Sequence, residues 1–260
     1  MAANSPAQAA SSPLEQSRSA AVEPTVFMGR GFDACSAPSL KAMRAWAHGA
    51  SPYGAVGIYI SGRQRGCEQT HLTADWISQV RELGWRLMPT HVGRQPPCSE
   101  RADSQQTIDP AHATQQGREE AAEAFTAARN LGLGRGTPVY LDLEAYPLGS
   151  AGCAQAVIDF TLGWTQGLHS AGYLSGFYSS TLSGVTDLLA ARRAGAAPMP
   201  DALWYARWND KAATDGDGLL RDNEWSGHRR AHQYHGKIKE SHGGVSLTID
   251  QNQLDTVVAG

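Results

Sequence analysis

The sequence alternates between short apolar runs, rich in β-branched and aromatic residues, and longer stretches with the periodicity of a helix. Residues 55–60, A-V-G-I-Y-I, form the clearest strand-like run, and residues 73–83 follow as a helix-like stretch. Within that stretch Trp76, Ile77 and Val80 share one face. A helix between successive strands is typical of a parallel sheet, because parallel neighbours need a long crossover connection. The alternation therefore predicts an α/β fold.

Eight strand-like segments are expected, at residues 26–33, 55–60, 85–92, 137–147, 173–179, 202–208, 231–234 and 246–250. Helices are expected at residues 38–48, 73–83, 109–131, 152–170 and 181–193. Asp109 is expected to cap the third helix, with Pro110 at its first position. Residues 211–227 are polar and irregular, with room for one short helix.

This count predicts a (β/α)8-type TIM barrel with irregular final units, because the last two connections do not resemble full helices. A doubly wound open sheet is the alternative. It fits less well, since such a sheet usually carries a Gly-rich phosphate turn after its first strand. The turn here, G-R-G-F-D-A-C, is not one.

Composition limits the classes of function. The 260 residues suffice for one large domain, expected at residues 25–260, after a disordered tail or linker at residues 1–24 that is not a signal peptide. A net charge of −3 provides no basic surface for nucleic acid. No apolar run reaches the roughly 18 residues of a membrane span. We expect a monomer without a cofactor.

The four cysteines are Cys35, Cys67, Cys98 and Cys153. None forms a C-x-x-C pair, which disfavours a zinc knuckle or a thioredoxin motif. An even number favours two disulfides formed in an oxidising compartment, with free buried thiols as the alternative. Three connectivities are open. We favour Cys35–Cys67 and Cys98–Cys153, because sequential neighbours would occupy adjacent loops at one end of the molecule.

The central strand-like stretch, residues 137–147, reads T-P-V-Y-L-D-L-E-A-Y-P and carries two acids. Asp142 and Glu144 would point to the same face of a strand, roughly 7 Å apart along the chain. Crowded carboxyl groups usually raise the pKa of one member, as an acid catalyst near neutral pH requires. A salt-bridged pair at a strand end is the structural alternative.

In a β/α barrel the carboxyl ends of the strands converge on one site. Acids are expected at four such ends, as Asp33, Asp142, Glu144 and Asp250. Aromatic residues are expected at others, as Tyr59, Tyr146, Tyr178, Trp208 and Tyr234. Aromatic rings cover the apolar faces of sugars, and carboxyl groups supply the acid–base chemistry of glycoside cleavage. Together they indicate a carbohydrate site, although each aromatic residue alone could be a packing residue.

Two other kinds of site are less well supported. The chain has no G-x-S-x-G elbow for a serine nucleophile. Four histidines crowd one region near Asp250, namely His228, His232, His235 and His242. On a strand His232 and His235 would point to opposite faces, so we expect hydrogen-bonded or solvated histidines and no metal. His91, at a strand end, could line a groove or belong to the core.

Six motifs in order carry a family resemblance: G-F-D at 31–33, L-D-L-E at 141–144, G-F-Y-S-S at 176–180, W-Y-A-R-W at 204–208, H-Q-Y at 232–234 and I-D-Q-N at 249–252. Across about residues 29–255 the chain resembles the family 25 lysozymes. It is more similar to the related glycoside hydrolase-like domain of unknown function 1906, found in exported bacterial proteins. One departure is His232, where the lysozymes tend to place a tryptophan.

The resemblance implies a role for each acid. Glu144 would be the general acid, and Asp142 would stabilise the positive intermediate or orient an N-acetyl group of the substrate. Asp33 and Asp250 would hold the charge balance and the sugar. The expected substrate contacts are Tyr59, Tyr146, Tyr178, Trp208 and Gln233.

The expected function is hydrolysis of a bacterial cell-wall polysaccharide, peptidoglycan foremost, by a secreted or wall-associated protein whose signal peptide is absent from this chain. One alternative is a carbohydrate- or wall-binding barrel that has lost turnover, because a fold does not settle a function. A wall scaffold or partner-interaction module is a third reading.

Overall fold

The computed structural model describes residues 24–47, 50–99 and 106–260. The expected tail at residues 1–24 lies outside the described residues except for Pro24, as does the expected end of the first helix at residues 48–49.

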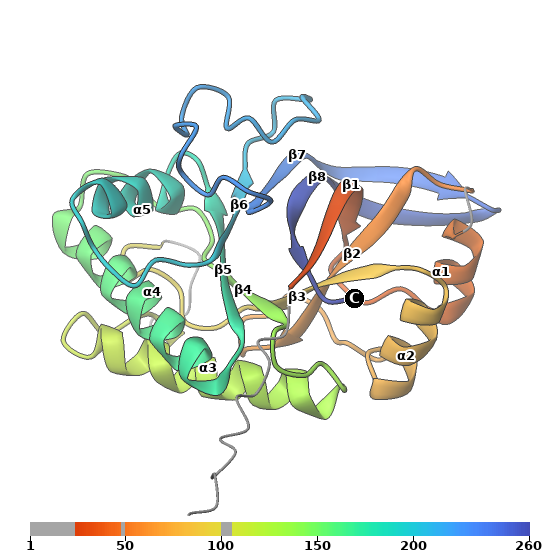
Figure 1. Ribbon diagram of the computed structural model, residues 1–260, viewed down its shortest axis with the longest axis horizontal. Coiled ribbons are helices and arrows are strands. Elements are labelled where there is room, and N and C mark those ends of the chain that lie inside the picture. The colour runs from red at the N-terminus through yellow and green to blue at the C-terminus, as the bar shows by residue number, and fades with distance from the viewer. Residues whose placement is uncertain (1–23, 48–49, 100–105) are drawn as a thin grey trace, which may run out of the picture.

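Eight strands follow one another around a closed barrel in sequence order, with helices on its outside (Figure 1). The strands are β1 Thr25–Asp33, β2 Tyr53–Ser61, β3 Arg86–His91, β4 Pro138–Asp142, β5 Leu174–Ser180, β6 Ala202–Ala206, β7 Arg230–His242 and β8 Val245–Val258. The helices are α1 Leu40–Trp46, α2 Ala74–Glu82, α3 Ala113–Asn130, α4 Ala151–Ala171 and α5 Gly184–Arg193. The predicted TIM-barrel-type fold is confirmed.

The final units are irregular, as predicted, but in a way that periodicity did not show. Strand β8 runs antiparallel to both of its neighbours, β7 and β1, whereas β1 to β7 pair in parallel. A tight turn at Gly243 and Gly244, both with positive φ, joins β7 to β8, so no crossover helix is needed. The short helix expected within residues 211–227 is absent from this fully described loop.

The last two strands are also much longer than the expected segments, at 13 and 14 residues. Their outer parts pair only with each other and extend beyond the barrel past α1 (Figure 1). The indole N–H of Trp46 on α1 donates to the carbonyl of Val245 at 2.9 Å. This part was missed because its residues alternate between exposed and half-buried and carry few apolar side chains.

The first turn of α3 differs from expectation as well. The helix begins at Ala113, three residues beyond the predicted first position at Pro110. The Asp109 carboxylate accepts from the amide of Ala111 at 3.0 Å and bonds the ring of His112, which closes a separate turn. A local side-chain turn thus replaces the predicted helix cap.

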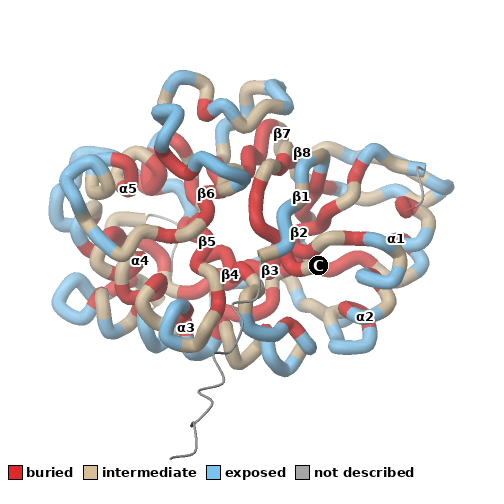
Figure 2. The backbone as a smooth tube through the Cα atoms, viewed as in Figure 1, coloured by how far each residue is buried: buried red, intermediate tan, exposed pale blue. Residues whose placement is uncertain are grey.

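Buried residues are concentrated along the barrel strands, and exposed ones lie on the outer helices and loops (Figure 2). The buried hydrophobic residues form two layers. The larger layer lies between the strands and the helices. The smaller one fills the barrel and includes Ala55, Met88, Tyr140, Trp204 and Leu254. The rings of Tyr140 and Trp204 meet edge to face there, with centroids 5.8 Å apart. This packed interior is the floor beneath the strand ends.

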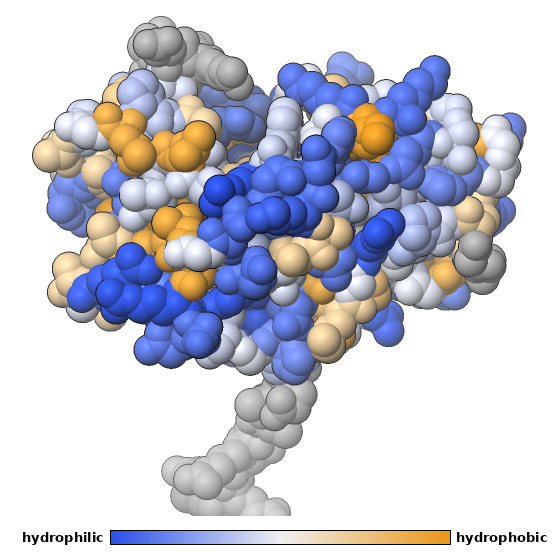
Figure 3. Space-filling model, turned by 90° about the horizontal axis from the view of Figure 1, so that it is seen from above, coloured by the Kyte–Doolittle hydropathy of each residue, from blue (hydrophilic) through white to orange (hydrophobic). Residues whose placement is uncertain are grey.

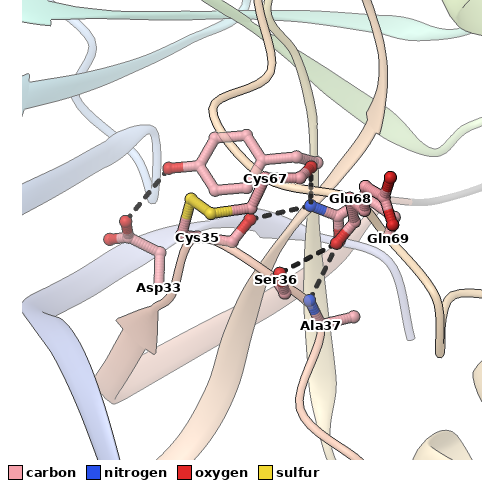
Figure 4. Close-up of a disulfide and its surroundings, with 8 residues drawn as sticks. Asp33, Cys35, Ser36, Ala37, Cys67, Glu68 and Gln69 are labelled. Atoms are coloured by element: carbon pink, nitrogen blue, oxygen red, sulfur yellow. Dashed lines mark hydrogen bonds between the residues drawn. A yellow bond between two sulfur atoms is a disulfide. The ribbon is translucent and has the colours of Figure 1, made fainter.

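Both favoured disulfides are present, and all four cysteines are paired. Cys35–Cys67 joins the loop after β1 to the loop after β2 and lies beside Asp33 (Figure 4). Cys98–Cys153 joins the loop after β3 to the first turn of α4. Each bond therefore fixes two loops that follow neighbouring strands.

Candidate active site

Asp33 ends β1 and is the centre of a hydrogen-bond network at the mouth of the barrel. Its side chain is 1% exposed. One carboxylate oxygen accepts from the hydroxyl of Tyr59 at 3.2 Å, and the other accepts from the amides of Gln233 at 3.1 Å and Asn252 at 2.7 Å. Burial, followed by the charge of Asp250, raises the pKa of Asp33 to about 7 despite these donors.

The two amides are themselves fixed by further bonds. The Gln233 oxygen accepts from the hydroxyl of Tyr178 and from the indole N–H of Trp208, both at 3.0 Å. The Asn252 oxygen accepts from the indole N–H of Trp204 at 2.8 Å. Each amide must therefore turn its NH₂ group toward Asp33. Asn252 was not among the expected site residues, although it is the last residue of the I-D-Q-N motif.

Asp250 lies within β8 and not at a strand end, which corrects the expectation. It faces Asp33 across the antiparallel pair β1–β8. A bulge in β7 turns the backbone amide of Lys237, which has φ of 58°, toward the Asp250 carboxylate. Burial raises the pKa of Asp250, and the amide and charge of Lys237 oppose that rise.

The acid pair differs from the expected strand geometry. Strand β4 ends at Asp142, so Glu144 lies in the following loop, where it is exposed while Asp142 is only 4% exposed. Burial, then the charges of Glu144 and Asp33, raise the pKa of Asp142 well above its ordinary value. One carboxyl oxygen of Asp142 is buried without a hydrogen-bond partner among the described residues. Burial and crowding thus favour the protonated form of Asp142 over that of an ordinary aspartate.

All four acids converge on one tyrosine. After burial, the causes that raise the pKa of Tyr178 are the charges of Asp142, Asp33, Glu144 and Asp250. The geometry agrees, because Asp142 is the register partner of Tyr178, and the Tyr178 hydroxyl bonds Gln233, which in turn bonds Asp33. The acids thus share one site, although they come from β1, β4, the loop after β4, and β8.

A pocket of about 840 Å³ opens beside this cluster. Four of the expected site residues line it, namely Glu144, Tyr178, Trp208 and Gln233. Leu182 from the loop after β5, and Arg207 and Leu219 from the loop after β6, are among its other lining residues. Seen from above, hydrophobic surface gathers on the side that carries α4 and α5, while the middle of this face is hydrophilic (Figure 3).

Trp208 has the geometry of a stacking platform. Its side chain is 57% exposed. The ring lies so close to Gly236 in β7 that a Cβ atom there would be 2.2 Å from a ring carbon. The indole therefore packs against the backbone of Gly236, and its exposed part lines the pocket.

Three of the expected aromatic residues do not line this pocket. Tyr59 is one of them, and its hydroxyl donates to Asp33. Tyr146 is 6% exposed, and its hydroxyl donates to Asp187 on α5 at 2.7 Å. Its place in the layer between strands and helices corrects its assignment as a substrate contact. Tyr234 is also buried, at 5%.

The histidines have partners other than a metal. His228 and His235 bond Asp255 and Asp210, and His242 bonds Glu240. Both ring nitrogens of His232 face carbonyl oxygens, those of Ala213 at 2.7 Å and Arg207 at 2.8 Å. Among residues 24–47, 50–99 and 106–260, no three His, Cys, Asp or Glu side chains are arranged to hold a metal ion.

His91 belongs to the core, the second of its two expected settings. It is fully buried and bonds the Ser61 hydroxyl at 2.8 Å and the Glu120 carboxylate at 3.0 Å.

In the described part of the chain, no helix is long and apolar enough to cross a membrane.

A family model matches residues 44–254, and its description is Rv2525c-like, glycoside hydrolase-like domain. This chain belongs to that family. The expected kinship with glycoside hydrolase-like domains is thereby confirmed. A search of curated proteins found no match for this Rv2525c-like domain.

Solved structures share its fold at low identity. An uncharacterised B. stearothermophilus protein has a TM-score of 0.57 and 17% identity, over 86% of this chain and 95% of the other. The Mycobacterium tuberculosis Tat-secreted protein Rv2525c, solved with HEPES, has a TM-score of 0.57 and 16% identity, over 89% and 99%. The catalytic domain of endolysin ply40 from Listeria monocytogenes bacteriophage P40 has a TM-score of 0.51 and 15% identity, over 88% and 93%.

Proposed function

We propose that this Rv2525c-like domain is a glycoside hydrolase that cleaves a bacterial cell-wall polysaccharide, with peptidoglycan as the first substrate to test. The observation that carries the proposal is the convergence of four carboxyl groups around Tyr178, beside a pocket with an exposed tryptophan. Glycoside cleavage needs one carboxyl group that holds a proton and another that bears charge, and crowding with uneven burial produces that difference.

Glu144 is the proposed proton donor, because it lines the pocket where a glycosidic oxygen can reach it. Asp142 lies buried next to it, and burial raises the pKa of Asp142 well above its ordinary value. In the proposed reaction the pair shares one proton. The proton passes from Asp142 to Glu144 and on to the leaving oxygen as the glycosidic bond breaks, and the Asp142 carboxylate left behind faces the positive charge on the sugar ring. Water then adds to the anomeric carbon and returns one proton to the pair.

Asp33 and Asp250 are proposed to balance charge and hold the sugar from the opposite side of the site. The Trp208 ring would cover an apolar face of a pyranose, while Tyr178, Tyr59 and Gln233 would bond its hydroxyl groups. The expected contact at Tyr146 is not retained. Two disulfides suit an oxidising compartment, which supports action outside the cell, and we retain the expectation of a monomer.

The test measures release of reducing ends from purified peptidoglycan by the parent protein, Glu144→Gln and Glu119→Gln. Glu119 is an exposed glutamate on α3, far in sequence from the pair, and is the matched control. We expect Glu144→Gln to lose about 10²–10⁴-fold in rate and the control to keep the parental rate. Equal rates for the parent and Glu144→Gln would contradict the proposal.

Co-sedimentation with insoluble cell walls separates catalysis from binding alone. It is measured on the same three proteins and on a variant in which all four acids are replaced by their amides. A parent protein that sediments with walls but releases no reducing ends would support the binding-barrel alternative. Sedimentation that survives loss of all four acids would support the scaffold reading.

A further inference from the structure

Gln95 lies in the loop after β3 and contacts the backbone on both sides of Leu143, between the two acids. Its side chain is 4% exposed. The side-chain oxygen accepts from the amide of Glu144 at 2.8 Å. The side-chain NH₂ group donates to the carbonyl of Asp142 at 3.1 Å and to the carbonyl of Gly93 at 3.2 Å.

The hydrogen bonds of Gln95 begin where β4 ends and its pairing with neighbouring strands stops. The amide of Leu143 still donates to the carbonyl of Tyr178 at 3.1 Å, although β4 has ended. The next amide, that of Glu144, bonds the side chain of Gln95 and not a strand. The backbone that carries Glu144 is therefore fixed against Asp142 by a side chain from another loop.

Gln95 is itself firmly anchored. Its own amide donates to the carbonyl of Gln106 at 3.0 Å, and its carbonyl accepts from Ile108 at 2.9 Å. The preceding amide, of Arg94, donates to both oxygens of Glu120 at 3.0 Å, and Glu120 also bonds the buried His91. A residue held on both sides can transmit a fixed position to the atoms it bonds.

We infer that Gln95 is a positioning residue that sets the separation of the Asp142 and Glu144 carboxyl groups; the inference rests on the proposed function. Both side-chain N–H groups and the oxygen already have partners in the protein, so Gln95 acts through the pair and not on the substrate. Small displacements of reacting groups cost large factors in rate.

The test compares Gln95→Met, which keeps the length and loses the hydrogen bonds, with Gln69→Met. Gln69 is a matched control because it makes the same kind of contact elsewhere. Its NH₂ donates to the carbonyls of Cys35 at 2.7 Å and Cys67 at 3.3 Å, and its oxygen accepts from Ala37 at 2.9 Å. The Cys35–Cys67 disulfide already joins those two loops.

We expect Gln95→Met to lower kcat by about 10–100-fold with little change in KM, and to shift the pH–rate profile. Gln69→Met should retain the parental kcat and profile. Parental kinetics in Gln95→Met, or an equal loss in Gln69→Met, would overturn the inference. If Gln95→Met does not fold, Gln95→Glu replaces it, since it keeps the acceptor for the Glu144 amide and loses both donors; the same losses are expected.

A second readout does not depend on turnover. Carboxyl ¹³C NMR titrations of the parent and Gln95→Met, with Asp142→Asn for assignment, report the protonation of the pair. Without the hydrogen bonds from Gln95, Glu144 can move away from Asp142, so the pKa of Asp142 should be lower in Gln95→Met than in the parent. An unchanged titration would overturn the inference. A parent protein that releases no reducing ends but shows this shift contradicts the proposed function and supports the positioning role.

Discussion

Asp33 and Asp250 face each other across the antiparallel pair β1–β8, one at the end of its strand and the other within its strand. Because the first residues of β8 extend beyond the end of β1 and pair only with β7, an acid near the middle of β8 lies level with the mouth of the barrel. The charge of Asp250 is the second largest cause, after burial, that raises the pKa of Asp33 to about 7. The pairing of Asp33 with Asp250 thus gives the site an acid whose pKa is about 7.

The raised pKa of Asp33 predicts a pH-dependent stability. Between the unfolded value of 3.8 and the folded value of about 7, the folded state binds more protons than the unfolded state. Stability therefore falls as pH rises through this range and is level above it. Asp33→Asn does not titrate, so its stability relative to the parent should rise by roughly 2–4 kcal/mol between pH 4 and pH 8. Urea unfolding at both pH values measures this.

Asp215→Asn is the control for that measurement, because Asp215 lies in the loop after β6 and does not contact Asp33. Its stability relative to the parent should not follow the same trend. A constant difference between Asp33→Asn and the parent across the range would contradict the prediction.

Asp142→Asn should separate catalysis from stability. Asparagine fills the same space but supplies no proton to the pair, so we expect kcat to fall by about 10²–10⁴-fold. The buried carboxyl group is costly to ionise, so the variant should unfold at a higher temperature than the parent at pH 8. Reducing-end assays and thermal unfolding on one preparation measure both. A variant that is less stable at pH 8 would count against a raised pKa of Asp142.

The packing of Trp208 on Gly236 predicts a binding defect from a single methyl group. Gly236→Ala would place its Cβ 2.2 Å from the indole, so the ring must move. We expect affinity for cell-wall fragments to fall roughly 3–30-fold, toward that of Trp208→Ala, as measured by titration calorimetry. Gly134→Ala, where a Cβ would meet nothing within 4 Å, is the control. Unchanged affinity in Gly236→Ala would argue against Trp208 as a sugar platform.

The two disulfides should differ in their resistance to reduction. By the chain-entropy estimate, loops of 32 and 55 residues each contribute about 4 kcal/mol to stability. Cys35 is exposed, whereas Cys153 is 4% exposed. Under increasing reductant, Cys35 and Cys67 should therefore be alkylated before Cys98 and Cys153, as mass spectrometry of digests would show. The reverse order would contradict this prediction.

The sequence by itself determined the barrel class and favoured, among three open connectivities, the disulfide pairing that the structure contains. The alternation of apolar runs and helical stretches is a local pattern, so it could be read along the chain, as could the N-cap at Thr73, whose hydroxyl accepts from Trp76 at 3.1 Å. The cysteine pairs followed from the order of the strands, because loops after neighbouring strands lie side by side.

Only the tertiary structure decided which acid of the pair is buried with a raised pKa, that β8 runs antiparallel, that Tyr146 faces the core, and that Gln95 bonds the backbone of the pair. Burial and charge act through space, so the pKa of Asp142 depends on Asp33, which is remote in sequence. A long loop with no periodicity gives no sign that one of its glutamines reaches another strand. These features depend on distances between side chains, which exist only once the barrel has closed.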